Sequence, residues 1–140
     1  MTTEEAQFEK NHEKETKIKY IEQIEIGGCT IDTWYYSPYP FEYEKQSKLY
    51  ICQFCLKYMR KEKTIRAHTK HSCTFNGPPG KLIYEDKNYT DSTFTGLSAF
   101  LVDGKDNKLY CQNLALLAKL FIDHKILYFD IRDYQFVVLT

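Results

Sequence analysis

The sequence predicts an α+β fold built from small antiparallel strands, one ββα finger and one long amphipathic helix. Three observations predict it. Cysteines and histidines gather at metal-ligand spacing within residues 52–73, apolar and polar residues alternate at residues 18–26, and apolar residues recur at helical spacing within residues 112–125. A strand pattern and a helix pattern in one short chain favour elements of both kinds around a shared core.

Composition and charge narrow the class of protein. The chain has 140 residues, enough for one domain or part of a larger one, and 43% are hydrophobic, which favours a packed core over disorder. Because 19 basic residues balance 19 acidic ones, binding nucleic acid is not the expected main task. No apolar run could span a membrane, and the N-terminus lacks the apolar stretch of a secretory signal. We therefore expect a reducing compartment, where clustered cysteines bind metals rather than form disulfides.

The first part of the chain is predicted to be a tail followed by a hairpin. Residues 1–17 are polar and mixed in charge, and we expect a disordered tail there, with the ordered part at residues 18–140. Residues 18–26 alternate as a half-buried strand does. The Gly-Gly pair that follows suits a hairpin turn, and CTIDTWYY is the predicted returning strand, ended by the prolines of SPYP.

The second half of the chain contains the clearest helix. KLIY predicts a short strand, EDKNYTDSTFTG a loop, and LSAFLVDGKDNKLYC a hairpin that turns at Asp103 and Gly104. The helix follows at residues 112–125, with Lys119 on its polar side. ILYFDI and YQFVVLT are predicted strands, and the second would present an apolar edge that favours aggregation. The apolar stripe of the helix contains Leu114, Leu117, Leu120 and Phe121.

The segment CQFCLKYMRKEKTIRAHTKHSC has the spacing of a zinc finger. Cys52 and Cys55 form a C-x2-C pair that suits a tight turn, and His68 and Cys73 follow a stretch of helix-forming composition. Thiolates together with imidazole favour zinc. Residues 49–73 therefore predict a structural zinc site whose four positions are filled by protein, which leaves none for substrate.

The ligand set of this site remains open on two points. Five residues turn an α-helix by about 500°, so His68 and Cys73 share no helix face unless the helix ends or loosens between them. His71 is a rival ligand that would leave Cys73 unused, although its spacing from His68 is short for a finger. Four unconnected side chains, or a disulfide, are disfavoured by the spacing and by the expected compartment.

The segments around the cluster carry a resemblance to a known family. WYYSPYP, LYICQFCLKYM, PPGKLIY, VDGKDNKLYCQNLALLAKLFIDHKILYFD and FVVLT occur in this order. Together they resemble the first part of the catalytic domain of MYST-type histone acetyltransferases, over residues 17–140, and YCQNLALLAKLFIDHK is the most specific run. The family has a C2HC zinc finger in this part, whose ligands Cys52, Cys55, His68 and Cys73 resemble one by one.

The resemblance implies a nuclear protein lysine acetyltransferase with a GNAT-like domain. It implies transfer of acetyl from acetyl-CoA to histone lysines, with histones, nucleosomes and acetyltransferase-complex subunits as partners. Two departures are local: four residues rather than three separate the last two finger ligands, and YTDSTFTG carries an insertion. In the family, the catalytic residues and the glycine-rich CoA loop follow FVVLT. No such loop occurs here, so we expect no catalytic residue, no acetyl-CoA-binding residue and no activity of these residues alone.

Two other functions compete with this interpretation. A stand-alone zinc-finger module would bind chromatin or a protein, with weak DNA contact through the basic finger face, although such faces are more often merely solvated. An enzyme using Cys111 and His124 as nucleophile and base is disfavoured, because the predicted helix holds them apart. The basic residues of the finger are Lys57, Arg60, Lys61, Lys63, Arg66 and Lys70.

Overall fold

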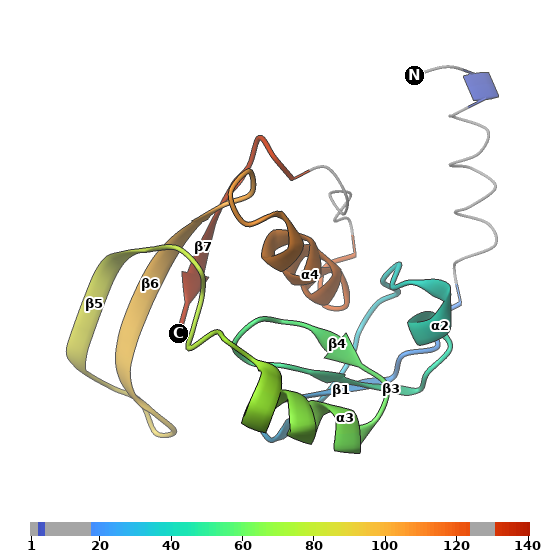
Figure 1. Ribbon diagram of the computed structural model, residues 1–140, viewed down its shortest axis with the longest axis horizontal. Coiled ribbons are helices and arrows are strands. Elements are labelled where there is room, and N and C mark those ends of the chain that lie inside the picture. The colour runs from blue at the N-terminus through green and yellow to red at the C-terminus, as the bar shows by residue number, and fades with distance from the viewer. Residues whose placement is uncertain (1–2, 5–17, 124–130) are drawn as a thin grey trace.

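The computed structural model describes residues 3–4, 18–123 and 131–140. This part of the chain contains two small sheets with the longest described helix between them, and shorter helical segments beside the first sheet (Figure 1). Most of the predicted tail and of the predicted strand ILYFDI lies outside the described residues. Among the helices that are described, none combines the length and the apolar content needed to cross a bilayer.

The first sheet has the strand order β2-β1-β3-β4. β1 (Gln23–Ile26) and β2 (Cys29–Asp32) form the predicted antiparallel hairpin, with Gly27 at a φ of 56° and Gly28 at a φ of 80° in the turn. Glycine adopts these left-handed values without the strain that a Cβ atom brings, which explains the Gly-Gly pair. The hairpin prediction is confirmed, with strands shorter than the sequence pattern.

One strand pair of this sheet is parallel. β3 (Lys48–Ile51) pairs in parallel with β1, and it pairs antiparallel with the two-residue strand β4 (Tyr58–Met59). A parallel pair needs a crossover, which is the segment from β2 to β3 that contains the short helix α2 (Phe41–Glu44). The sequence predicts antiparallel strands only, so this parallel pair is a correction. Alternation of apolar and polar residues shows which face of a strand is buried, but it does not show which strand pairs with it.

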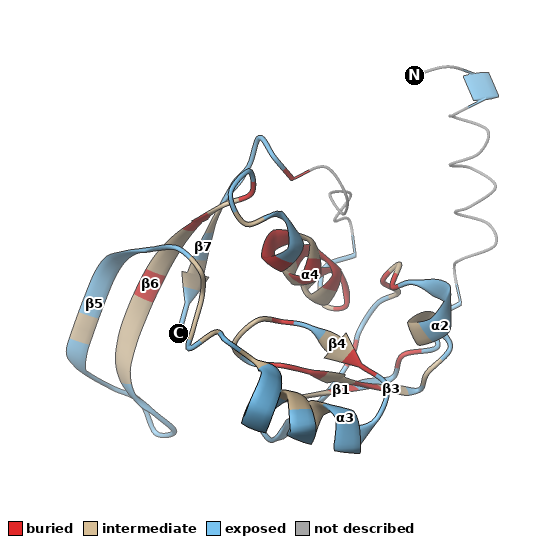
Figure 2. Ribbon diagram, in the orientation of Figure 1, coloured by how far each residue is buried: buried red, intermediate tan, exposed pale blue. Residues whose placement is uncertain are grey.

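A helical segment follows β4 and completes the finger. α3 (Glu62–Ala67) continues directly into η1 (His68–Ser72), a turn of π-helix. Neither element buries any residue, and Figure 2 shows α3 as a largely exposed helix below the first sheet. This helical segment therefore lacks a buried face of its own to stabilise it.

The second sheet has the strand order β5-β6-β7 and is antiparallel throughout. β5 (Lys81–Thr90) and β6 (Thr95–Asp103) form a long hairpin. β7 (Gln135–Leu139) pairs with the other side of β6 and lies at an edge of the sheet, where Val137 and Leu139 are 60% and 66% exposed. Most of YQFVVLT therefore forms an edge strand as predicted, and alternate apolar residues of that strand face outward.

The predicted loop at EDKNYTDSTFTG is wrong, because most of this segment is β-strand. Its loop-like composition reflects an irregularity within the strand and the turn that follows. The pairing register shifts between Asp86 and Thr90, and the Asp86 carboxylate accepts hydrogen bonds from the backbone N–H groups of Asn88 and Tyr89. Asp and Asn favour such local bonds, but pairing with β6 decides the strand.

The predicted hairpin at Asp103 and Gly104 is also wrong. The chain does turn there, since the Asp103 carboxylate accepts a hydrogen bond from the backbone N–H of Lys105 at 2.8 Å. After the turn the chain enters the helix α4 (Lys108–Lys119) instead of a second strand. Tyrosine and cysteine suit either a strand or a helix, so the sequence pattern of KLYC does not separate the two, and in the structure these residues form the first turn of α4.

α4 lies between the two sheets and shares one core with both of them (Figures 1 and 2). Ile24 and Leu49 come from the first sheet, Val102 comes from the second, and Leu120 lies at the end of α4; each is at most 1% exposed. The finger and the second sheet are therefore packed against one another through a single helix.

Lys119 lies in the interior, which corrects the prediction of a polar-side residue. It is 7% exposed, and its ammonium group donates a hydrogen bond to the carbonyl of Tyr36 at 2.5 Å. Burial lowers the pKa of Lys119. Ser37 donates to the carbonyl of Leu116 at 2.7 Å, so the segment after β2 covers this face of α4. Helical periodicity cannot show that a loop supplies a carbonyl acceptor for a buried lysine.

Candidate metal centre

A tight turn at the end of β3 carries the first two candidate ligands, Cys52 and Cys55. The backbone N–H of Cys52 donates to the carbonyl of Lys57, and the N–H of Leu56 donates to the carbonyl of Cys52, both at 2.9 Å. Leu56 has a φ of 62°, a left-handed conformation that costs a leucine about 1–2 kcal/mol. The turn leaves both thiols on the side that faces the finger helix.

The other two candidate ligands flank the π-helical turn η1. The backbone N–H of Cys73 donates to the carbonyl of His68 at 2.8 Å, which is the i to i+5 bond of a π-helix. An α-helical path would turn these two side chains to different faces, whereas the wider turn returns Cys73 towards His68. The prediction that the helix loosens between these residues is confirmed.

The four side chains converge closely enough to bind one ion. The Sγ atoms of Cys52 and Cys73 are 3.7 Å apart, and Cys55 Sγ lies 3.2 Å from His68 Nε2. All four donor atoms lie within 4.8 Å of one another. Zinc–sulfur bonds of about 2.3 Å and zinc–nitrogen bonds of about 2.0 Å place tetrahedral ligand atoms about 3.5–3.8 Å apart. The donor set and its spacing therefore fit zinc.

Burial favours the uncharged forms of the cysteine and histidine side chains at this site when no metal ion is bound. Cys52 is fully buried, and the other three residues are half-buried. Burial raises the pKa of the Cys55 thiol to about 12, although a hydrogen bond from the Lys57 backbone opposes it. Burial, together with the positive charge of Lys57, lowers the pKa of His68. Neutral imidazole is the form that binds a metal, while the thiols must lose their protons on binding.

The remaining cysteines and the rival histidine lie apart from this group. His71 is exposed and is not one of the four converging residues. Cys29 is exposed in β2, and Cys111 is buried in the core on α4. His124, the proposed partner of Cys111 in the disfavoured enzyme hypothesis, lies outside the described residues.

Aromatic side chains support the finger from the side of β4, which the sequence pattern did not indicate. Tyr58 packs edge-on against Tyr39 and Tyr43, with ring centroids 4.9 Å and 4.8 Å apart. Phe75, just after the last candidate ligand, stacks on Tyr110 of α4 with centroids 6.4 Å apart. The Tyr58 contacts join β4 to the segment between β2 and β3, and the Phe75–Tyr110 contact joins the finger to α4.

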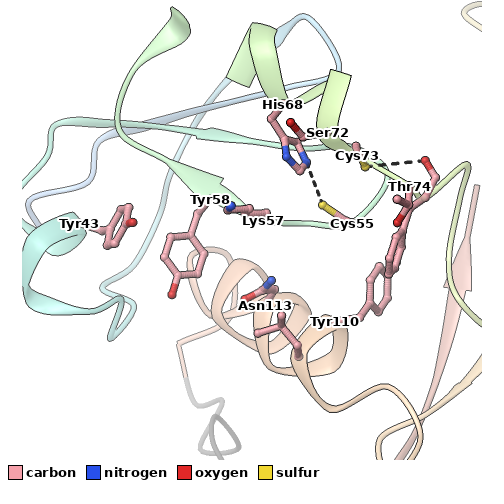
Figure 3. A pocket seen from close by; sticks show the side chains of 12 residues that line it. Tyr43, Cys55, Lys57, Tyr58, His68, Ser72, Cys73, Thr74, Tyr110 and Asn113 are labelled. Atoms are coloured by element: carbon pink, nitrogen blue, oxygen red, sulfur yellow. Dashed lines mark hydrogen bonds between the residues drawn. The ribbon is translucent and has the colours of Figure 1, made fainter. Parts of the chain in front are cut away.

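Asn113 is the polar residue near this site that sequence reasoning missed. It lies in α4 and is 7% exposed, beside the metal-binding residues in Figure 3. A signal was present in the sequence, because Asn113 lies three residues after Tyr110 and four before Leu117, on the apolar face of the helix. A polar residue within an apolar stripe indicates a specific hydrogen-bonding role or a local cleft.

Comparison with known proteins identifies both halves of the chain. Residues 18–73 match the model of the MYST family zinc finger domain, and residues 77–140 match the model of the MOZ/SAS family. The histone acetyltransferase MOF of Drosophila melanogaster is 47% identical over 139 residues, which cover 99% of this chain and 16% of the relative.

Two further relatives agree. The putative MYST-like histone acetyltransferase 1 of Oryza sativa is 47% identical over 130 residues, 93% of this chain and 27% of the relative. Histone acetyltransferase KAT6B of Homo sapiens is 49% identical over 122 residues, 87% of this chain and 6% of the relative. The chain thus spans a minor part of the length of these relatives. With two successive family matches and a Cys3His cluster in the first, the chain belongs to the MYST family and carries its structural zinc finger.

Proposed function

We propose that these residues form the zinc-finger part of a nuclear protein lysine acetyltransferase domain, which transfers acetyl from acetyl-CoA to histone lysines. The relatives named above are histone acetyltransferases, and their similarity extends through both the finger and the second sheet. Similarity to these relatives that extends across both family segments is the observation that carries the proposal. Histones or nucleosomes would be the substrates, and subunits of an acetyltransferase complex the partners.

Within such a domain the role of the finger is structural. Cys52, Cys55, His68 and Cys73 would hold zinc, which supplies a cross-link between the β3–β4 turn and the finger helix. Four protein donors complete a tetrahedral site, and this is the arrangement of structural rather than catalytic zinc. The finger packs against α4 through Phe75 and Tyr110, so the cross-link also fixes the position of the central helix.

Replacing the candidate ligand His68 and its rival His71, one at a time, tests the proposed ligand set. His68→Ala is expected to weaken zinc binding by more than about 100-fold, because even the outer-shell partners of metal ligands contribute about 10–100-fold. His71→Ala should leave the affinity close to that of the parent chain, since this side chain lies outside the converging group. Zinc affinity would be measured by competition with a chromophoric chelator. The opposite ranking would assign the site to His71.

A chimera tests the proposed function. Residues 18–140 would replace the matching segment of the Drosophila relative, and the purified chimera would be assayed with acetyl-CoA and a histone-tail peptide. We expect transfer by the chimera and none above background by these 140 residues alone, because they contain no glycine-rich loop that opens a helix. A folded, zinc-loaded chimera without activity would contradict the proposal, as would transfer by the chain alone.

The basic face of the finger supports weak DNA contact as a second candidate function. α3 and η1 bury no residue and present Lys63 and Lys70 to solvent, and Lys61, the residue before α3, is exposed as well. Arg66 is paired with Glu62, so one cation of this face is partly neutralised. Binding through such a face should fall steeply with salt, because it releases counterions from the phosphates. Fluorescence anisotropy with a labelled duplex would exclude this function if no binding occurred at low salt.

A further inference from the structure

β5 forms one edge of the second sheet. The strand order is β5-β6-β7, so among the residues that the structure describes β5 is paired on its β6 side only. Figure 1 shows β5 on the side of this sheet that lies away from the first sheet. An edge strand presents a row of unpaired backbone N–H and C=O groups, which can pair with a further strand. β5 has ten residues, whereas strands usually have about five or six, so this edge is long.

Three consecutive apolar residues of this edge are exposed. Leu82, Ile83 and Tyr84 are 44%, 49% and 54% exposed, and Figure 2 shows β5 as a largely exposed strand. Successive side chains alternate between the two faces of a strand, so the edge carries apolar surface on both faces. A partner strand laid along this edge would cover apolar side chains and pair backbone groups at the same time.

The charges of β5 are arranged to match a second copy of the same strand. Lys81 comes just before the three apolar residues, and Glu85 and Asp86 come just after them. When two copies pair antiparallel, Lys81 of each lies opposite the acidic residues of the other, and residues 82–84 of both copies meet at the two-fold axis. Neither Lys81 nor Glu85 takes part in the two ion pairs formed among the described residues.

The same charges disfavour the alternative arrangement. In a parallel pair in register, Lys81 would face its own copy, and the acidic residues would face theirs. Like charges directly opposite one another across two strands are destabilising. Lysines on an edge usually prevent pairing for this reason, but here the antiparallel arrangement gives Lys81 an acidic partner. The charge pattern therefore selects the antiparallel, two-fold arrangement.

An irregularity within β5 is compatible with this pairing. The register between β5 and β6 shifts between Leu82 and Tyr84, which makes Ile83 the extra residue. A bulge bends its strand, and at many edges it hinders further pairing. Here the bulge lies at the centre of the apolar segment, so the two-fold axis passes through it. Both copies are then bent in the same way and at the same point.

We propose that two copies of this chain associate by antiparallel pairing of their β5 edges around residues 81–86. Backbone hydrogen bonds hold the two strands together, and Lys81 with its acidic partners sets their direction and register. A single strand edge is small beside the about 800 Å² per partner of a standard interface, so the association is weak and depends on concentration. It requires neither acetyl transfer nor the metal ligands, because β5 belongs to the second sheet.

Sedimentation equilibrium of the zinc-loaded chain over a range of concentrations tests the proposal. Lys81→Glu and Glu85→Lys each place like charges opposite one another, and each acts twice in a two-fold dimer. Asp86 is left unchanged because its carboxylate accepts the backbone hydrogen bonds of the β5 irregularity. Lys105→Glu is the matched control, since this lysine is exposed and lies outside β5. Val137→Lys tests the opposite edge of the sheet, on β7.

We expect a reversible monomer–dimer equilibrium for the parent chain. Lys81→Glu and Glu85→Lys should each weaken it by about tenfold, and Lys105→Glu should not change it. An equimolar mixture of Lys81→Glu and Glu85→Lys, one of them fluorescently labelled, should form heterodimers with about the affinity of the parent, because the mixture pairs opposite charges again.

Several results would overturn the proposal. A parent chain that stays monomeric at every concentration would do so, as would equal association by Lys81→Glu and the parent. A mixture that fails to restore association would show that the two charges do not face one another. Loss of the dimer in Val137→Lys but not in Lys81→Glu would assign the contact to the β7 edge instead.

Discussion

Removing zinc with a chelator is expected to unfold the finger and to loosen the core around α4. Apparent binding energies of structural zinc sites are about 10–16 kcal/mol near neutral pH, which is comparable to the entire stability of a small domain. α3 has six residues and buries none of them, so it cannot persist alone. Amide hydrogen exchange across residues 49–73 and near-UV circular dichroism would measure the loss, and added zinc should restore both signals.

The substitution Cys52→Ser provides the genetic form of this experiment. It removes a fully buried candidate ligand, so stoichiometric zinc and exchange protection should both be lost. Cys29→Ser is the matched control, because Cys29 is exposed in β2 and lies outside the converging group. Elemental analysis of both proteins would check the result. A chain that keeps its near-UV spectrum without zinc would contradict a metal-dependent fold.

Leu120→Ala is expected to destabilise the described core by about 2–5 kcal/mol. Leu120 is fully buried, and its side chain belongs to the cluster that joins both sheets. Its carbonyl accepts hydrogen bonds from the backbone N–H groups of Trp34 and Tyr35, and these bonds survive the substitution because they use the main chain. The expected loss is therefore that of apolar packing and of the cavity left behind. Urea unfolding of the zinc-loaded protein measures it.

Leu109→Ala is the control for this experiment, on the same helix. Leu109 is 71% exposed, so its truncation should change the unfolding free energy by no more than about 0.5 kcal/mol. Similar losses for both variants would show that α4 does not act as the shared core element. A change in the urea slope without a change in midpoint would instead indicate that the two sheets unfold separately.

The sequence was most informative where local chemistry decides the structure. The Gly27–Gly28 turn depends on backbone conformations that glycine favours, and the C-x2-C spacing depends on the reach of a tight turn. Both effects act within a few residues, so they can be predicted from the local order of residues alone. The same holds for the apolar stripe of α4, where Leu120 is buried as its spacing predicts.

The sequence was least informative where a distant partner decides the structure. β5 is a long strand although it is rich in loop-forming residues, because β6 supplies its backbone partners. Lys119 is buried because the segment after β2 offers the Tyr36 carbonyl. The parallel pairing of β3 with β1 depends on a crossover that no local pattern encodes.

The π-helical turn between His68 and Cys73 has a consequence for how such fingers tolerate insertions and deletions. A turn that can widen absorbs one additional residue locally, so the two side chains keep their convergence while the chain length between them varies. A search pattern with one fixed interval at this point would therefore pass over genuine members. The distance between donor atoms, rather than the count of intervening letters, is the property that selection can preserve.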